Sequence, residues 1–295
     1  MEFRTKVELP IGECEIRHDS LIMSWGSCFA DNISRKLIEN KFSCDANPFG
    51  VLYNPLSVAQ SLQTLLHERY YTENDLQYAN GQWFSLMHHG SFSSADKDEC
   101  LDGINERIRS GAANLRKARI AIITWGTARV YEWGADGSIV GNCHKLPEKM
   151  FRHRLLEVDE IVEKYVSLIS EIRACNPDLH FLFTISPIRH AKDGFHGNQL
   201  NKATLLIALH KICEQLPCCH YFPSYEIMMD ELRDYRFYAD DMLHPSPLAV
   251  EYIWQCFCDT YFKQDTLQIM RQWDDIRKGI EHRPFNAESD AYRCF

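Results

Sequence analysis

The feature that most constrains the fold of this chain is a set of short apolar runs without polar alternation. They occupy residues 21–25 (LIMSW), 118–126 (ARIAIITWG) and 180–186 (HFLFTIS), with a shorter candidate at 218–222 (CCHYF). Such runs are typical of strands buried on both faces, and strands separated by helices pair in parallel. The sequence therefore predicts an α/β fold, a three-layer doubly wound sandwich with a mostly parallel central sheet. The expected helices span 29–41, 55–68, 103–118, 158–175, 200–216 and 246–262.

The length of the chain favours a single domain over residues 1–295. A chain of 295 residues can bury about 75% of its unfolded surface, so it needs neither disulfides nor a metal to fold. Two segments depart from the helix–strand rhythm and are expected to be loop insertions. Residues 70–99 are polar and aromatic without a period, and 127–153 place a glycine-containing turn between apolar-aromatic arms, which predicts a hairpin. The tail from about His282 is expected to be loosely packed.

Charge and hydropathy limit the partners. The chain has 32 basic and 41 acidic residues, a net charge of −9, which argues against general nucleic-acid binding because there is no basic excess. Apolar runs such as 121–123 are too short to span a bilayer. The first residues, MEFRTKVELP, lack the apolar stretch of a signal peptide. We therefore expect a cytoplasmic protein with a small-molecule partner, no nucleic acid and no membrane span; the oligomeric state is left open.

The twelve cysteines do not form a recognisable framework. They are spread from Cys14 to Cys294, and no C-x-x-C occurs. The adjacent pair Cys218-Cys219 does not suit a structural zinc site. In a reducing compartment, free thiols are the expectation. The sequence therefore predicts no metal and no cofactor.

Ser27 is the first candidate for chemistry. It follows Gly26 between the strand at 21–25 and the helix at 29–41, so it projects from the carboxyl end of a core strand, where open α/β sheets place their ligands. A helix N-terminus also favours developing negative charge, and Gly26 allows close approach. The alternative is that Ser27 only caps the helix.

The second candidate is the pair Asp241 and His244, just before the helix at 246–262. Asp241 lies three residues before His244, so it can curl back, accept the proton on one imidazole nitrogen and fix the tautomer, as the third member of a serine triad does. The neighbouring Asp240 would point away. If the sheet is doubly wound, His244 lies at the same edge as Ser27, and we expect a hydrogen bond between them. The alternative is a surface turn with a solvated Asp and His.

These residues resemble a known family. The string Trp25-Gly26-Ser27-Cys28-Phe29-Ala30 contains the five letters that name the GSCFA family, which belongs with the SGNH (GDSL-like) hydrolases. The resemblance continues through residues 47–50, 125–127, 142–145, 186–187 and 241–246, and so covers about 20–260. It implies a flavodoxin-like three-layer fold. It also implies that Ser27 is the nucleophile, His244 the general base and Asp241 its orienting partner.

The resemblance leaves one part of the oxyanion hole open. Members of the superfamily combine the nucleophile's backbone N–H with a Gly and an Asn, and Gly50 matches the Gly. The usual Gly-x-Asn-Asp after the third strand is absent, and Thr127 stands there. The third donor is therefore expected from Thr127, or from Asn47 or Asn142 brought in by a loop. One such donor is worth about 10²–10³ in rate.

Three further residues are candidates for substrate binding. Trp125, together with Tyr131, would form a sugar-stacking or acyl-binding wall, although aromatic residues near a hairpin are more often core. His89, next to His88, would line a pocket or bind a metal; the alternative is a solvated pair. Arg189 follows the strand at 180–186 and would hold an anionic group or make a surface ion pair.

The sequence thus predicts a metal-independent serine hydrolase that cleaves a carboxylic ester through an acyl-enzyme. The substrate would carry its acyl group on a sugar or another small polar alcohol. Cys28 offers a thiol nucleophile, but the helix that begins there is expected to turn it into the core. Two alternatives remain: an acyltransferase with the same nucleophile, and a non-catalytic binding module on the same fold.

Overall fold

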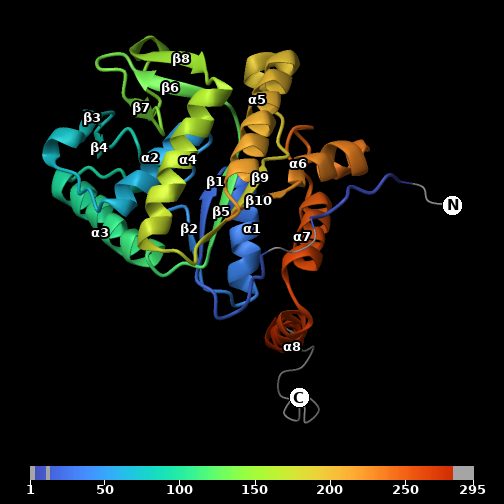
Figure 1. Cartoon of the computed structure of the whole chain (residues 1–295). Helices are drawn as coiled ribbons and strands as arrows, with labels where there is room; N and C mark the ends of the chain where they lie inside the picture. Colours follow the sequence, from blue (N-terminus) through green and yellow to red (C-terminus); the bar gives the residue numbers. More distant parts are fainter. Residues whose placement is uncertain (1–3, 11–13, 282–295) are drawn as a thin grey trace, which may run out of the picture.

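The central sheet of the computed structural model, which describes residues 4–10 and 14–281, has five strands in the order β10-β9-β5-β1-β2 (Figure 1). Every neighbouring pair is parallel. The predicted α/β architecture is confirmed; the predicted loose tail from His282 lies outside the described residues. The strands are β1 (Ile22–Gly26), β2 (Cys44–Ala46), β5 (Ile120–Trp125), β9 (His180–Ile185) and β10 (Cys219–Phe222).

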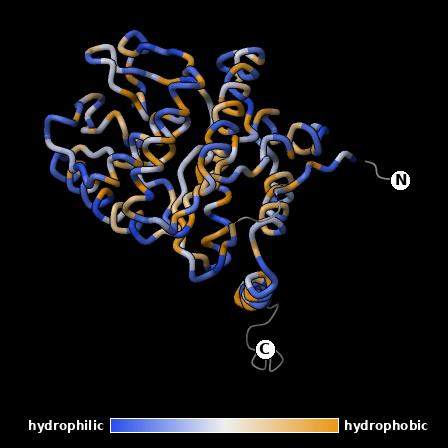
Figure 2. The backbone as a smooth tube through the Cα atoms, viewed as in Figure 1, coloured by the Kyte–Doolittle hydropathy of each residue, from blue (hydrophilic) through white to orange (hydrophobic). Residues whose placement is uncertain are grey.

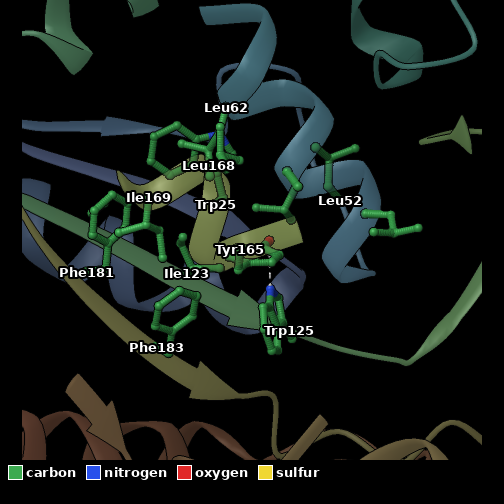
Figure 3. Close-up of a cluster of buried hydrophobic side chains, with 14 of the residues drawn as sticks. Trp25, Leu52, Leu62, Ile123, Trp125, Tyr165, Leu168, Ile169, Phe181 and Phe183 are labelled. Atoms are coloured by element: carbon green, nitrogen blue, oxygen red, sulfur yellow. Dashed lines mark hydrogen bonds between the residues drawn. The ribbon is translucent and has the colours of Figure 1, made fainter. Parts of the chain in front are cut away.

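One face of the sheet is covered by four helices. These are α2 (Pro55–Leu66), α3 (Lys97–Leu115), α4 (Val158–Cys175) and α5 (Gly194–Gln215). Successive side chains of a strand point to opposite faces, so Trp25, Ile123 and Phe183 meet the apolar sides of these helices. Figure 3 shows this cluster, in which Trp125 and Tyr165 lie beside Phe183.

The other face is covered by α1 (Cys28–Glu39) and α7 (Pro247–Tyr261). The predicted apolar stripe of the first helix is confirmed, since Phe29, Ile33 and Leu37 are buried. Ser246 caps α7 by accepting the Ala249 N–H. The hydropathy colouring of Figure 2 places apolar residues along the central strands.

Several boundaries differ from the sequence prediction. α3 begins at Lys97 and α5 at Gly194, six residues before the predicted starts at 103 and 200. Their first turns are mostly polar, and the prediction relied on apolar residues repeating at helical spacing, so it missed these turns. Asp96 caps α3 by accepting the Glu99 N–H. A further helix, α8 (Gln264–Glu281), was not predicted.

The two insertions form small antiparallel sheets. Residues 70–99 contain the hairpin β3 (Gln77–Ala79) and β4 (Gln82–Phe84). The predicted hairpin in 127–153 is confirmed as β6 (Arg129–Trp133) and β7 (Ile139–Val140), and β8 (Phe151–Leu155) adds a third strand. β8 was not predicted because its sequence, FRHRL, is mostly basic and has few apolar residues. In Figure 1 this sheet lies at the end of the molecule opposite α8.

The remaining elements are short helical turns. They are η1 (Glu73–Asp75), η2 (Gly90–Phe92), η3 (Glu148–Met150), η4 (Ala191–Asp193), α6 (Ser224–Glu226), η5 (Ile227–Glu231) and η6 (Tyr235–Phe237). Among the described helices, none combines the length and apolar character needed to cross a membrane.

Candidate active site

Ser27 lies in the turn from β1 to α1, at the carboxyl edge of the sheet. It is the N-cap residue of α1, yet its side chain makes no capping hydrogen bond. The hydroxyl instead donates to Oγ of Ser186, 3.3 Å away at the end of β9. Only 1% of Ser27 is exposed. The hydroxyl is therefore not used to cap the helix and faces the ends of the neighbouring strands.

Gly26 and Asn47 fix the backbone before Ser27. Gly26 has φ +147°, and a Cβ there would lie 2.5 Å from the carbonyl oxygen of Thr124, so only glycine fits. Its N–H donates to Oδ1 of Asn47 at 2.9 Å, and Nδ2 of Asn47 donates to Asp31. Asn47 thus uses its Oδ1 and one of its two Nδ2–H groups to position the turn. Its second Nδ2–H keeps it a candidate oxyanion donor.

Asp241 and His244 form the predicted contact. Oδ2 of Asp241 lies 2.5 Å from Nδ1 of His244, while Oδ1 accepts the N–H groups of Leu243 and His244 at 2.9 Å each. These backbone hydrogen bonds, followed by the one to the imidazole, lower the pKa of Asp241 to about 2. Met242 between them has φ +58°, a left-handed conformation that turns the chain back. Nε2, on the other side of the ring, has no hydrogen bond to any residue that the structure describes.

The predicted hydrogen bond between Ser27 and His244 is not formed within the described residues, because the Ser27 hydroxyl bonds Ser186 instead. The segment that follows Ser186 nevertheless contacts the loop of His244. The N–H of Arg189, three residues after Ser186, donates to the carbonyl of Leu243 at 3.3 Å. Both side chains of the Asp241–His244 pair are 47% exposed. The Ser27 hydroxyl has to leave Ser186 before it can donate to an imidazole.

Lys202 is a site residue that the sequence analysis missed. The residue is 1% exposed, and its Nζ donates to the carbonyls of Gly126 at 2.8 Å and Ser186 at 2.7 Å. Burial, followed by the charge of Arg189, lowers its pKa to about 7. Lys202 therefore ties the ends of β5 and β9 together directly behind the Ser27–Ser186 contact. Its helical spacing to the buried residues Asn198 and Leu205 was the available signal.

Some of the expected oxyanion donors already make a hydrogen bond within the protein, and others do not. The Gly50 N–H donates to the Asn47 carbonyl at 2.8 Å, so the expectation for Gly50 is wrong in this conformation. A Cβ on Gly50 would lie 2.2 Å from Cβ of His89, which explains the glycine by packing. The Thr127 N–H donates to the Tyr53 carbonyl, while its hydroxyl accepts from the Arg129 N–H and keeps its own proton to donate.

Two further donors are available. The Ser27 N–H donates to no group in the part of the chain that the structure describes. Oδ1 of Asn142 accepts the His144 N–H, which leaves its NH₂ group toward a cavity of about 420 Å³. The Ser27 N–H, the Thr127 hydroxyl and the Asn142 amide therefore remain the candidate oxyanion donors, together with the second Nδ2–H of Asn47.

This cavity lies beside the turn of Ser27. Its wall residue Tyr53 interacts with Cys28, the neighbour of Ser27. The charged or titratable side chains of its wall are three histidines, two basic residues and one carboxylate. The lining includes Tyr53, His89, Thr127, Arg129, Tyr131, Asn142, His153, His190, Lys192 and Asp193. The cavity walls therefore combine polar groups with aromatic rings and aliphatic surface.

Two of the three residues predicted to bind substrate line a cavity, and the third is buried in the core. His89 lines the cavity. Trp125 does not: it is fully buried and its Nε1–H donates to the Tyr165 hydroxyl at 3.1 Å, so the prediction of a substrate wall is wrong and Trp125 is core (Figure 3). Arg189 lines a second cavity, of about 530 Å³, together with Asp241, and donates to Sδ of Met229.

Two other expectations are corrected. Cys28 is exposed rather than turned into the core, because the first turn of α1 buries Phe29 and Ala30 instead. His88 is not half of a solvated pair. It stacks on Phe49, and burial lowers its pKa to about 3, so it is a neutral core residue.

Two family models match the chain and together cover most of it. The model of the GSCFA family matches residues 21–257, and the model of the GSCFA domain protein, C-terminal domain, matches 273–295. No curated protein matches the chain.

Solved structures give weaker likenesses. A family 3 carbohydrate esterase from Clostridium thermocellum has a TM-score of 0.37 and 9% identity, covering 86% of this chain and 98% of that one. A carbohydrate esterase family 3 protein from Talaromyces cellulolyticus has a TM-score of 0.36 and 8% identity, covering 86% and 99%. An acetyl xylan esterase from Butyrivibrio proteoclasticus has a TM-score of 0.37 and 11% identity, covering 90% and 65%. Function must therefore be argued from the site.

Proposed function

The chain belongs to the GSCFA family, and from this premise we propose that it is a serine hydrolase of the SGNH type that cleaves a carboxylic ester. One observation carries the proposal. The buried Ser27 hydroxyl serves no capping role, and the paired Asp241 and His244 lie on a loop that contacts the same edge of the sheet. A serine, an imidazole and an orienting carboxylate are the three members of a hydrolytic triad.

The first half of the reaction forms an acyl-enzyme. The Ser27 hydroxyl leaves Ser186 and donates to Nε2 of His244, which takes the proton as Oγ attacks the ester carbonyl. Asp241 stabilises the imidazolium through Nδ1 without taking its proton. The protonated His244 then gives the proton to the leaving alcohol as the ester C–O bond breaks.

The second half releases the acid. His244 removes a proton from water, the resulting hydroxide attacks the acyl carbon, and the proton returns to Ser27 Oγ as the acyl–serine bond breaks. The oxyanion formed in each half is held by the Ser27 N–H and by Thr127 or Asn142. The N-terminus of α1 favours this negative charge.

The substrate class follows from the cavity beside Ser27. Its hydroxyl, amide and imidazole groups suit a polyhydroxylated alcohol, and its tyrosine rings offer flat faces. An acyl group on a sugar or another small polar alcohol is therefore the substrate that this site fits best. An acyltransferase would use the same acyl-enzyme with an alcohol in place of water.

One observation favours a second candidate, a binding module without turnover. Ser27 is 1% exposed and bonds Ser186 rather than His244, so its hydroxyl is not poised for attack in this conformation. Catalytic hydrogen bonds often form only when a substrate is bound, and the hydrolase therefore stays the first candidate.

The experiment is turnover of short-chain aryl esters by the wild type, Ser27→Ala and the matched control Cys28→Ala. We expect the first variant to lose about 10⁴ or more in kcat, because triad members act as a unit. Cys28→Ala, one residue away, should keep most of the activity. Wild-type turnover by a folded Ser27→Ala protein would exclude the proposed mechanism; no turnover by any of the three would favour the binding module.

A further inference from the structure

Three metal-ligating side chains meet at the amino-terminal edge of the sheet, away from Ser27. His180 is the first residue of β9 and His220 the second residue of β10, and Nδ1 of His180 lies 3.1 Å from Nε2 of His220. His220 is in register with Leu182, so both imidazoles point to one face. Cys14 completes the group, and its Sγ and the two nitrogens all lie within 4.8 Å of one another.

The arrangement fits one tetrahedral ion. Zinc binds imidazole nitrogen at about 2.0–2.1 Å and thiolate sulfur at about 2.3 Å, which places tetrahedral ligands roughly 3.3–3.7 Å apart. The two imidazole nitrogens are already at nearly that separation, and only Cys14 has to close in. Two imidazoles and one thiolate select zinc rather than magnesium or calcium, which prefer oxygen ligands.

The cavity beside the three side chains leaves room for a fourth metal ligand. Cys14 and His220 are buried, whereas His180 is half-buried and lines a cavity of about 640 Å³. Through this cavity an ion can enter and keep a water or carboxylate ligand. The other charged side chains of its lining are Glu15, Arg17, Asp19, Lys117, Arg119 and Asp178. Two of the three basic ones are paired with carboxylates, Arg119 with Asp178 at 2.8 Å and Arg17 with Glu15 at 3.6 Å.

We propose that Cys14, His180 and His220 bind one zinc-class transition-metal ion. The ion joins the N-terminal segment to the first residues of β9 and β10, and so its role is structural. A cysteine binds a metal ion as the thiolate, so the Cys14 thiol must lose its proton. Binding breaks the hydrogen bond between the two imidazoles, and the proton that they share moves to the other nitrogen of its own ring. It also replaces the S–H bond by a metal–sulfur bond and releases the thiol proton to solvent.

The proposal does not rest on the ester chemistry. Ser186, which contacts Ser27, lies six residues beyond His180 along one extended strand, roughly 20 Å away. The ligands come from segments more than 160 and 200 residues apart (180 − 14 and 220 − 14), so no spacing motif in the sequence indicates them. A metal here should therefore raise the melting temperature and leave ester turnover unchanged.

The test is titration of the metal-free full-length protein with Co²⁺, with a reductant that does not bind metals. We expect one Co²⁺ per chain, with visible ligand-field bands of tetrahedral cobalt and a near-ultraviolet thiolate charge-transfer band, both lost when Zn²⁺ is added. Cys14→Ser should remove the charge-transfer band. His180→Gln should weaken cobalt affinity on the order of 100-fold. Even the loss of a residue that only hydrogen-bonds a metal ligand typically lowers metal affinity by about 10–100-fold.

Cys175→Ser is the matched control because it removes an exposed cysteine outside the cluster. It should leave both bands unchanged. Absence of a thiolate band in the wild type would overturn the proposal, as would a band that survives in folded Cys14→Ser. His180→Gln, at a half-buried position, keeps the test decisive if Cys14→Ser fails to fold: undiminished cobalt binding by this variant would equally contradict the site.

Discussion

At the scale of single residues, two adjacent nucleophilic side chains in the turn after β1, those of Ser27 and Cys28, differ in their exposure to solvent. Ser27 points between the strand ends and is buried, while its neighbour Cys28 reaches the surface. The serine is held by Ser186, and Asp241 holds the imidazole of His244. The site in this conformation is thus two hydrogen-bonded pairs on adjacent loops. The proposed reaction requires the serine to change partner.

Asp241→Asn tests the pairing with His244. The low pKa of Asp241, about 2, keeps the carboxylate ionised throughout the neutral range, where it can stabilise an imidazolium. We expect the variant to lose about 10⁴ in kcat with little change in KM, because an amide favours the wrong tautomer. The neighbour provides the control: Asp240→Asn should be nearly silent in steady-state kinetics. Equal losses in both variants would mean that the loop as a whole, rather than this carboxylate, matters.

At the scale of elements, the sequence predicted what is periodic or local. The stripe Phe29, Ile33 and Leu37 defined α1, and a separation of three residues sufficed to pair Asp241 with His244. Contacts between distant elements could not be predicted in this way. Lys202 reaches two strand ends from α5, and its helical spacing marks it as buried without showing which groups it bonds. Trp125 was misplaced because an apolar side chain at a strand end can face either the core or a ligand.

Lys202→Met tests the link between β5, β9 and α5. Because the folded-state pKa of Lys202 is about 7 against 10.5 for a free lysine, the unfolded chain holds a proton that the folded chain has released between these values. Raising the pH through this window therefore favours the folded state in the wild type, by at most about 1.4 kcal/mol per pH unit. The variant lacks this contribution.

The measurement is the free energy of unfolding of both proteins by urea at pH 7, 8.5 and 10. We expect the wild type to gain stability relative to Lys202→Met as the pH rises. In parallel, kcat of the variant should fall more than KM changes, since the backbone beside Ser27 loses its anchor. A stability difference that is independent of pH would show that Lys202 keeps an ordinary pKa in the folded protein.

At the scale of the whole molecule, the two edges of the sheet carry different chemistry. The carboxyl edge holds Ser27, the Asp241–His244 loop and the cavity of about 420 Å³, and the amino edge holds Cys14, His180 and His220. The strands that separate them are almost entirely buried. The chain can therefore bind a metal at one edge without using it at the other.

Treatment with a chelator distinguishes the ester site at one edge of the sheet from the metal site proposed at the other. Since the proposed nucleophile is a serine hydroxyl activated by an imidazole, we expect ester turnover at 25 °C to be unchanged by EDTA. The melting temperature of zinc-loaded protein should fall under the same treatment, because a ligand bound only by the folded state stabilises it. Turnover that disappears with EDTA and returns with a divalent ion would assign the metal to the chemistry instead.

The most direct measurement of the central claim is the site of covalent labelling by a fluorophosphonate. The wild type is treated with the reagent, digested, and the phosphonylated residue located by tandem mass spectrometry. The proposed mechanism predicts one stoichiometric adduct, on Ser27, which is lost in Ser27→Ala and strongly slowed in Asp241→Asn. An adduct on Ser186 or another residue, or no adduct at all on a protein that turns over esters, would contradict it.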